Sequence, residues 1–337
     1  TISFTGTPVS VVSPQNGSTS KHNSGTSVEN LGATVLQLLD SALSQGSKQL
    51  YKRAFMMYSQ FSQTQLHMEC CLPIKVSSLA LFIAHLVNEG LASSTIHSYI
   101  SALAYIHKLA GVTDPTQFFL IRKMLLGLQK RGTKPEFRQP ITIDILHKLV
   151  VSLPKTCPSY YEHVMFKSMY LLAFHAFLRI GEITYNGNAD NVLQLSNVKF
   201  FKLGNTYPSK LEISFGSYKS HYNCTPVTLS IPVFEKEEFC PVLALFQYLK
   251  LRRAREGPLY VQPNQKAVSY QNFCYILKQT LLVAQCNPSM YKSHSFRIGA
   301  ASTAASQGVP EADIQAMGRW HSNAFKRYIR VPMLHLG

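Results

Sequence analysis

The succession of helical patterns between residues 31 and 132 constrains the fold most. Apolar residues recur three and four positions apart in several consecutive segments, which is the period of an amphipathic helix. Three of these segments end at Gly90, Gly111 and Gly132, and glycine is common at helix ends. The predicted helices span residues 31–44, 47–63, 76–90, 93–111 and 114–132. We therefore predict a small helical bundle, and with it a domain, over residues 31–132.

Residues 1–28 differ from the predicted bundle in composition. They are rich in Ser, Thr, Gly and Asn and contain few large apolar residues. Such a segment buries too little apolar surface to offset the entropy lost on ordering, so we expect a disordered lead-in. Because the first residue is Thr, we also expect this chain to be a fragment or a processed form.

A basic segment with one Gly and two Pro, residues 130–142, begins at the end of the bundle. It carries Lys130, Arg131, Lys134 and Arg138. The composition predicts a linker over residues 133–140, and its charge suits a chain that crosses a phosphate backbone. Charges are also common in linkers that bind nothing, so both interpretations stay open.

The remainder, residues 141–337, mixes two periodicities and is long enough for a second domain. The alternation of apolar and polar residues in 211–215 and 225–231 predicts two half-buried strands. Lys219 would lie at the tip of the hairpin that joins them, where a lysine often only protects a sheet edge. Helical patterns cover residues 141–153, 161–184, 241–254 and 269–284. The whole chain is therefore predicted to be mainly α with a small antiparallel β-sheet.

Charge and cysteine content restrict the class of protein. Lys and Arg outnumber Asp and Glu by 33 to 17, and a net charge of +16 points first to a polyanion such as nucleic acid. The seven cysteines include no C-x-x-C pair, which favours reduced, mostly buried thiols in an intracellular protein. The chain shows neither a signal peptide nor an uncharged apolar run of about 18 residues, so we expect neither secretion nor a membrane span.

Residues 294–328 gather polar and aromatic side chains in a segment otherwise built from small and apolar residues. His294 and Arg297 are three positions apart at the start of a predicted helix, where phosphates commonly bind. The single Trp, Trp320, and Tyr328 follow, the latter in a predicted final helix. Taken alone, each of these side chains is more often structural, since buried aromatic and polar groups mainly serve packing.

Arg179 and Glu182 form a second pair three positions apart, at the end of the predicted helix over 161–184. A charge in so apolar a segment needs a partner, and an Arg–Glu ion pair with a purely structural role satisfies that need. The alternative is that both residues belong to the same site as His294 and Arg297.

Together these residues resemble the ordered active-site set of the tyrosine recombinases, the phage-integrase family that includes Cre and the Xer proteins. The set comprises R-x-x-E at 179–182, Lys219, H-x-x-R at 294–297, G-R-W at 318–320 and Tyr328. Cre also carries Trp where most members have His, although the span from Trp320 to Tyr328 is one residue shorter here. G-R-W followed by A-x-x-x-Y-I also resembles the recombinases of eukaryotic DIRS, Ngaro and Crypton mobile elements.

The resemblance implies both a fold and an activity. Residues 31–132 would form a SAM-like core-binding domain that contacts DNA, and residues 141–337 would form an α+β catalytic domain. Tyr328 would attack a DNA phosphodiester and form a 3′-phosphotyrosyl intermediate. Because that link stores the bond energy, neither a metal nor ATP is expected as a cofactor. The implied partners are double-stranded DNA and further copies of the chain in a synaptic tetramer, in the nucleus of a eukaryote or the nucleoid of a bacterium.

Each residue receives a role from the same resemblance. Arg179 and Arg297 would clamp the nonbridging phosphate oxygens, because guanidiniums bind them in bidentate fashion and keep their charge. The remaining roles are proton transfer or phosphate binding for His294, an indole N–H donor for Trp320, the general acid for Lys219 and an orienting group for Glu182.

Two alternatives share part of this pattern. A type IB topoisomerase has a similar pocket, but a helical bundle followed by a basic linker favours the recombinase. A domesticated, catalytically silent DNA-binding protein would not be expected to keep the complete residue set. Nine residues follow Tyr328, whereas a C-terminal element commonly docks on a neighbouring protomer in this family. The short tail thus weakens the expectation of synapsis more than that of cleavage.

Overall fold

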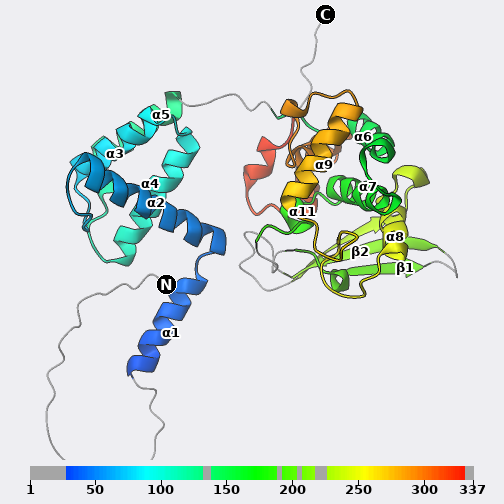
Figure 1. The fold of residues 1–337 in the computed structure, drawn as a ribbon, viewed down its shortest axis with the longest axis horizontal. Coiled ribbons are helices and arrows are strands. Elements are labelled where there is room, and N and C mark those ends of the chain that lie inside the picture. The colour runs from blue at the N-terminus through cyan, green and yellow to red at the C-terminus, as the bar shows by residue number, and fades with distance from the viewer. Residues whose placement is uncertain (1–27, 132–137, 188–191, 203–206, 217–225, 331–337) are drawn as a thin grey trace, which may run out of the picture. The chain divides into compact units, whose positions relative to one another are not determined.

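The computed structural model describes residues 28–131, 138–187, 192–202, 207–216 and 226–330. The chain forms two compact units that divide between Pro135 and Glu136 (Figure 1). The predicted lead-in, except for its last residue, lies outside the described residues, as do Lys134, Lys219 and most of the predicted linker. None of the described helices is both long and apolar enough to cross a lipid bilayer.

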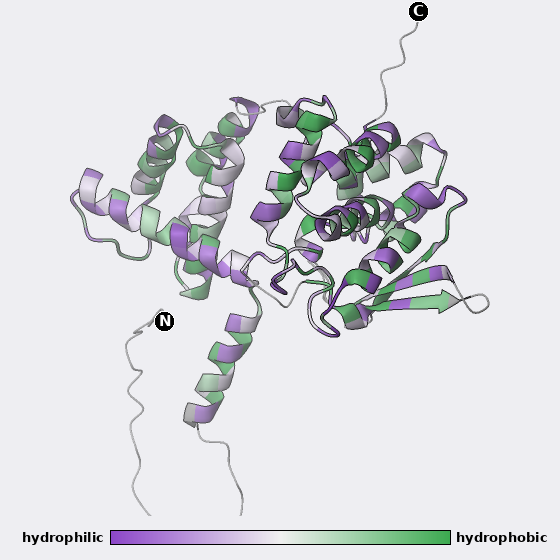
Figure 2. Ribbon diagram, turned by 45° about the vertical axis from the view of Figure 1, so that its right-hand side comes forward, coloured by the Kyte–Doolittle hydropathy of each residue, from purple (hydrophilic) through white to green (hydrophobic). Residues whose placement is uncertain are grey.

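The first unit consists of helices and one 3-10 turn. Its elements are α1 (Val28–Ser41), α2 (Gln45–Gln65), α3 (Val76–Asn88), α4 (Ser93–Leu109), the 3-10 turn η1 (Pro115–Gln117) and α5 (Phe119–Arg131). Leu79, Phe82 and Leu103 are fully buried in its core. Hydrophobic and hydrophilic residues alternate along these helices (Figure 2), and in α2 to α5 the hydrophobic face is buried. Residues 30–41 of α1 are exposed throughout, so α1 does not share in this core.

The second unit combines helices with a small sheet. Its helices are α6 (Ile143–Thr156), α7 (Tyr160–His175), α8 (Pro241–Leu251), α9 (Tyr270–Val283), α10 (Ser295–Ser306) and α11 (Glu311–Met317). Its 3-10 turns are η2 (Ile180–Glu182), η3 (Leu195–Asn197), η4 (Glu237–Phe239), η5 (Pro288–Met290) and η6 (Asn323–Arg327). Helix α7 is apolar almost throughout and packs against α6, α8 and α10, so it forms the centre of the core.

The sheet has the order β1 (Val198–Lys202), β2 (Pro208–Phe215) and β3 (Val227–Pro232), and both pairs are antiparallel. The predicted inward residues of β2 are buried: Leu211 and Ile213 are fully buried, and Phe215 is 3% exposed. Ile213 pairs with Leu229 on β3, where burial alternates as predicted. The prediction of a mainly α fold with a small antiparallel sheet is therefore confirmed.

The two helices that were predicted to carry Arg179 and Tyr328 differ from the prediction in the structure. The helix predicted over 161–184 stops at His175, because Phe177 adopts left-handed backbone with φ of 50°. Arg179 and Glu182 consequently lie at the two ends of a 3-10 turn instead of on one helix face. The predicted final helix is likewise only the 3-10 turn η6, and Tyr328 is its C-cap residue.

Helix α10 approaches the segment before α6 closely enough to exclude any side chain at Gly299. A Cβ there would lie 1.8 Å from the carbonyl oxygen of Ile141, a backbone atom with little room to move. The Ile141 N–H also donates to the carbonyl of Ser295 at 3.0 Å, which fixes the two segments together.

We expect Gly299→Ala to lower the free energy of unfolding by about 3 kcal/mol or more, the upper range for overpacking, because backbone must shift. Urea or thermal unfolding measures this loss. The control is Gly127→Ala in α5, where a Cβ would meet no atom within 4 Å. It should raise stability by about 0.5–1 kcal/mol through its effect on helix propensity. Equal effects of the two substitutions would contradict the close packing at Gly299.

Candidate active site

The first turn of α10 supplies two of the predicted site residues. His294 is the N-cap of α10, and Arg297 follows one turn later. The Arg297 side chain is fully buried, and its two terminal nitrogens donate to the carbonyl oxygens of Phe177 and Gly318. Arg297 thereby links the loop after α7 to the loop after α11.

These two loops share one backbone design. Each helix ends with a left-handed residue other than glycine: Phe177 with φ of 50° after α7, and Arg319 with φ of 53° after α11. In each loop the next backbone N–H, from Leu178 or Trp320, bonds to a carbonyl five residues earlier at 3.0 Å. This is the Schellman pattern, in which the left-handed position usually holds glycine. The turns direct Arg179 and Trp320 toward the first turn of α10.

The carboxylate of Glu182 lies between two arginines. Its Oε1 accepts from Nη1 of Arg179 at 3.1 Å, and its Oε2 accepts from the backbone N–H of Arg179 and from Nη2 of Arg319, both at 2.9 Å. The Arg179 side chain is 24% exposed, whereas that of Arg319 is 1% exposed. Of this pair, Arg179 is therefore the guanidinium that solvent and ligands can reach.

Tyr328 is held at both its ring and its backbone. Its hydroxyl shares a 2.7 Å hydrogen bond with Nε2 of His294, and the two ring centroids are 5.1 Å apart. Its carbonyl oxygen accepts from the Ser302 hydroxyl of α10 at 3.1 Å. The Ser302 oxygen in turn accepts from the backbone N–H of Arg330 at 2.8 Å. One helix therefore carries His294 at its start and the Tyr328 anchor two turns later.

The Trp320 ring contacts both the guanidinium of Arg297 and the ring of Tyr328. The Arg297 guanidinium lies 4.0 Å from the centre of the Trp320 ring, and the ring of Tyr328 is 5.2 Å from that of Trp320. A cation over an indole face is a favourable contact, more so when it is shielded from water. The indole also packs on Gly318, where a Cβ would lie 1.6 Å from a ring carbon, so only glycine fits there.

The charges in this cluster act on one another. Burial, followed by the guanidinium of Arg179, lowers the pKa of Arg297 to about 9; the Glu182 carboxylate opposes the shift and Arg319 adds to it. Arg297 remains cationic at neutral pH, but its charge is costly in this environment. A bound anion would relieve that cost.

The structure thus brings together six of the residues that the sequence pattern selected. They are Arg179, Glu182, His294, Arg297, Trp320 and Tyr328. Lys219 and Lys134 lie outside the described residues. Lys130 and Arg131 are exposed at the end of α5, and Arg138 is half-buried in the second unit. The chemical roles of all these residues remain predictions.

Three residues of the site escaped the sequence-based prediction. Arg319 belongs to the G-R-W triplet, but no pattern indicated that its side chain would reach Glu182. Ser302 is one of many small residues in α10, and nothing distinguishes it before Tyr328 is placed beside it. Phe177 contributes a backbone carbonyl, which accepts from Arg297 and, at 3.4 Å, from Arg319.

Comparison with known proteins adds a sequence match and a fold. Residues 37–111 match the family model described as phage integrase, N-terminal SAM-like domain. An integrase/recombinase xerD homolog from Selenomonas ruminantium is 22% identical over 285 residues, covering 81% of this chain and 78% of that protein.

Several solved structures have a similar fold. The Tn1549 transposon integrase in complex with a circular intermediate DNA is 14% identical with a TM-score of 0.57, covering 87% of this chain and 91% of that one. The XerH site-specific recombinase bound to palindromic difH substrate is 15% identical with a TM-score of 0.59, covering 85% of this chain and 76% of that one. A lambda integrase dimer bound to a core site is 12% identical with a TM-score of 0.56, covering 90% of this chain and 77% of that one. At these identities the likeness concerns the fold.

Proposed function

Because this chain has the fold of the tyrosine recombinases, we propose that it is a site-specific DNA recombinase or integrase that cleaves and rejoins double-stranded DNA. The observation that carries the proposal is the 2.7 Å hydrogen bond between Tyr328 and His294, next to the guanidiniums of Arg179 and Arg297. A nucleophile, a group able to accept its proton and cations for a phosphate are thus gathered in one place.

The proposed reaction is a transesterification. A phenol has an unperturbed pKa of about 10, so it is a weak nucleophile until its proton is removed. His294 would accept that proton as the Tyr328 oxygen bonds to phosphorus and the bond from phosphorus to the 5′-oxygen breaks. The departing 5′-oxygen takes up a proton, for which we propose Lys219 as the donor. A 5′-hydroxyl attacking the phosphotyrosyl link reverses these steps and rejoins the strand.

The two clamping arginines differ in access. Arg179 is partly exposed, so it would contact a nonbridging oxygen first. Arg297 lies beneath Trp320, at 4.0 Å from its ring, and beneath Tyr328, at 5.8 Å. In the proposed reaction the phenol passes its proton to His294 as its oxygen moves to phosphorus, and this movement of the ring uncovers the guanidinium of Arg297. Guanidiniums there would stabilise the charge that develops on the transferred phosphate.

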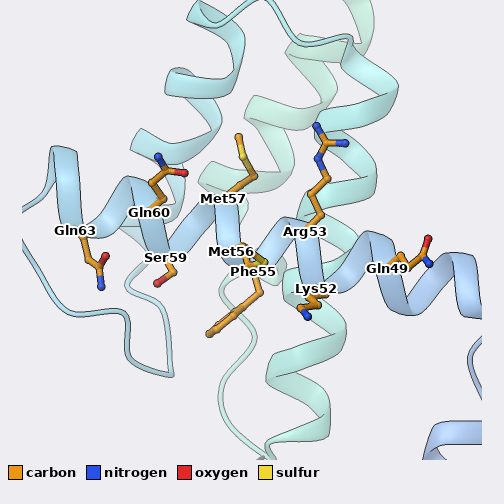
Figure 3. A pocket seen from close by; sticks show the side chains of 9 residues that line it. All are labelled: Gln49, Lys52, Arg53, Phe55, Met56, Met57, Ser59, Gln60 and Gln63. Atoms are coloured by element: carbon orange, nitrogen blue, oxygen red, sulfur yellow. The ribbon is translucent and has the colours of Figure 1, made fainter. Parts of the chain in front are cut away.

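DNA binding is proposed to involve both units. The chain carries a net charge of +16, and the similar integrase and recombinase structures contain DNA. In the first unit, α2 exposes Lys52 and Arg53 along a shallow hollow (Figure 3), and α5 exposes Lys130 and Arg131 at its end. Contacts spread over many phosphates give strong but largely sequence-independent affinity. As the resemblance to the tyrosine recombinases implies, we further propose that four copies of the chain bring two duplexes together in synapsis.

The two alternatives, a type IB topoisomerase and a silent DNA-binding protein, are not favoured by the comparisons. A duplex nicked next to the scissile phosphate separates the silent protein from both enzymes, and a closed supercoiled plasmid, together with a strand-exchange assay, separates the topoisomerase from the recombinase. A recombinase accumulates a covalent protein–DNA adduct on the nicked duplex and exchanges strands between duplexes. A topoisomerase forms the adduct but relaxes supercoils as a monomer, and a silent protein binds without any adduct.

We expect millimolar sulfate, a mimic of the phosphate, to stabilise the protein through this site. The lowered pKa of Arg297 means that its charge reduces the free energy of unfolding at neutral pH. This penalty begins to shrink only as the pH rises above about 9, and it is gone once the pH exceeds the ordinary pKa of arginine. Sulfate that binds only the folded protein would stabilise it by about 2.7 kcal/mol at a hundred times its dissociation constant.

Thermal unfolding with sulfate or chloride at equal ionic strength measures the effect. The rise in Tm should be larger at about pH 7 than at about pH 10, because Arg297 begins to lose its charge above its lowered pKa. Sulfate also stabilises proteins without binding a site, so the Arg179→Ala variant gives the baseline to subtract. An equal rise in both proteins would contradict an anion site.

A further inference from the structure

Arg319 occupies a position that its backbone conformation makes unfavourable. A left-handed residue other than glycine costs about 1 kcal/mol or more, and Arg319 has φ of 53° immediately after α11. Glycine would satisfy this turn without strain. The long charged side chain is nevertheless buried, so its contacts must offset both the strain and the loss of solvation.

Those contacts lead directly to the proposed phosphate clamp. Nη2 of Arg319 donates to Oε2 of Glu182 at 2.9 Å, and Oε1 of the same carboxylate accepts from Arg179 at 3.1 Å. The Arg319 guanidinium also lies 3.8 Å from the centre of the Phe215 ring at the end of β2. Arg319 thus holds one oxygen of the Glu182 carboxylate while the Arg179 side chain bonds the other.

Sharing the carboxylate changes what Arg179 can do. An arginine and a carboxylate left to themselves tend to form a bidentate pair, in which both terminal nitrogens of the guanidinium are occupied. Here Oε2 is taken by Arg319 and by the backbone N–H of Arg179, so the Arg179 side chain bonds Glu182 through Nη1 alone. The other donors of Arg179 stay available to an anion. One negative charge divided between two cations also leaves Arg179 more attractive to a phosphate.

We propose that Arg319 is a positioning residue that acts through Glu182 to hold Arg179 ready for the scissile phosphate. The inference rests on the proposed function. Arg319 does not qualify as a catalytic residue, because its side chain is only 1% exposed while that of Arg179 is 24% exposed. It sets the geometry and charge of a group that touches the substrate.

The substitution Arg319→Gly tests this role cleanly, since glycine relieves the backbone strain while removing the guanidinium. We expect the rate of adduct formation on the nicked duplex to fall about a hundredfold, the scale of a misplaced catalytic group, while duplex affinity stays within about twofold. Gln265→Gly is the matched control, because Gln265 is an exposed left-handed residue with φ of 64° in a turn. It should cleave like the unsubstituted protein.

A double-mutant cycle separates positioning from general structural damage. If Arg319 acts through Glu182, then Arg319→Gly should cost at most about threefold more in rate when Glu182 is already Gln. Arg319→Lys should recover part of the rate, because it restores a charge but not the planar fork. A full hundredfold loss in the Glu182→Gln background, or a rate for Arg319→Gly equal to that of the control, would overturn the proposal.

The sulfate response keeps this inference distinct from the proposed function. If the unsubstituted protein binds duplex DNA but forms no adduct, the proposed function fails and the anion site is judged alone. A sulfate-dependent rise in Tm that persists in Gln265→Gly and disappears in Arg319→Gly then supports the positioning role. An equal rise in both variants, or a rise in neither, overturns it.

Discussion

Replacing Tyr328 by Phe is expected to reduce covalent attachment to a nicked duplex by about 10⁴-fold or more, the scale on which loss of a nucleophile acts. The substitution removes one oxygen, which is the atom that His294 contacts at 2.7 Å and the atom that would bond to phosphorus. Denaturing gel electrophoresis of labelled DNA measures the adduct. Affinity for the intact duplex should change by less than about twofold, because it is spread over many phosphates.

Two controls accompany this prediction. The ring of Tyr328 keeps its contacts with Trp320 and His294 in the phenylalanine variant, so Tm should change by only a few degrees. Tyr275→Phe removes the hydroxyl of a tyrosine that is 60% exposed on α9, and it should leave adduct formation unchanged. Persistence of the adduct in Tyr328→Phe would exclude Tyr328 as the nucleophile.

Replacing Arg179 by Ala should lower the rate of adduct formation by about 10³-fold with little loss of duplex affinity or stability. Removing a guanidinium that stabilises a transferred phosphate has effects of about this size or greater. The Arg179 side chain is partly exposed and ends in a salt bridge with Glu182, which retains Arg319 as a partner. Single-turnover kinetics on the nicked duplex, together with equilibrium binding, measure the two quantities separately.

Arg297→Ala provides the contrast within the same clamp. It should abolish cleavage too, but it also leaves the carbonyls of Phe177 and Gly318 without their guanidinium donor. Each buried acceptor that loses its partner costs about 1–3 kcal/mol, so this variant should unfold at a lower temperature. Near-normal cleavage by Arg179→Ala would refute the clamp, whereas loss of cleavage by Arg297→Ala alone would leave its cause ambiguous.

Sequence periodicity is sufficient to predict most of the fold. Apolar spacing of three and four places the helices of both units, and strict alternation identifies the inward residues Leu211, Ile213 and Phe215 of β2. These predictions succeed because burial of an apolar face dominates the choice of local structure. The nearly uniform apolar composition of α7 likewise predicts its central place in the core.

Helix ends around the site could not be predicted from the same patterns. A left-handed residue after a helix is usually glycine, and Phe177 and Arg319 carry no such mark. The apolar pattern over 161–184 therefore predicts a helix that continues through Arg179. The chain instead turns at Phe177, and Arg179 has extended backbone.

Long-range polar contacts were predictable only in part. Ordered motifs could select Arg179, His294, Arg297, Trp320 and Tyr328, because their types and order carry chemical information. The bridge from Glu182 to Arg319 spans 137 positions along the chain, and it depends on two loops meeting in space. The burial of Arg297 under Trp320 depends on the same meeting, so no local pattern could reveal it.

The most direct test of the proposed function is to identify the atom that joins this protein to DNA. The protein is allowed to react with a nicked duplex, the adduct is digested with protease and nuclease, and the modified peptide is sequenced by mass spectrometry. We predict a 3′-phosphate ester on the phenolic oxygen of Tyr328. A link through any other residue, or DNA that is bound but never covalently joined, would contradict it.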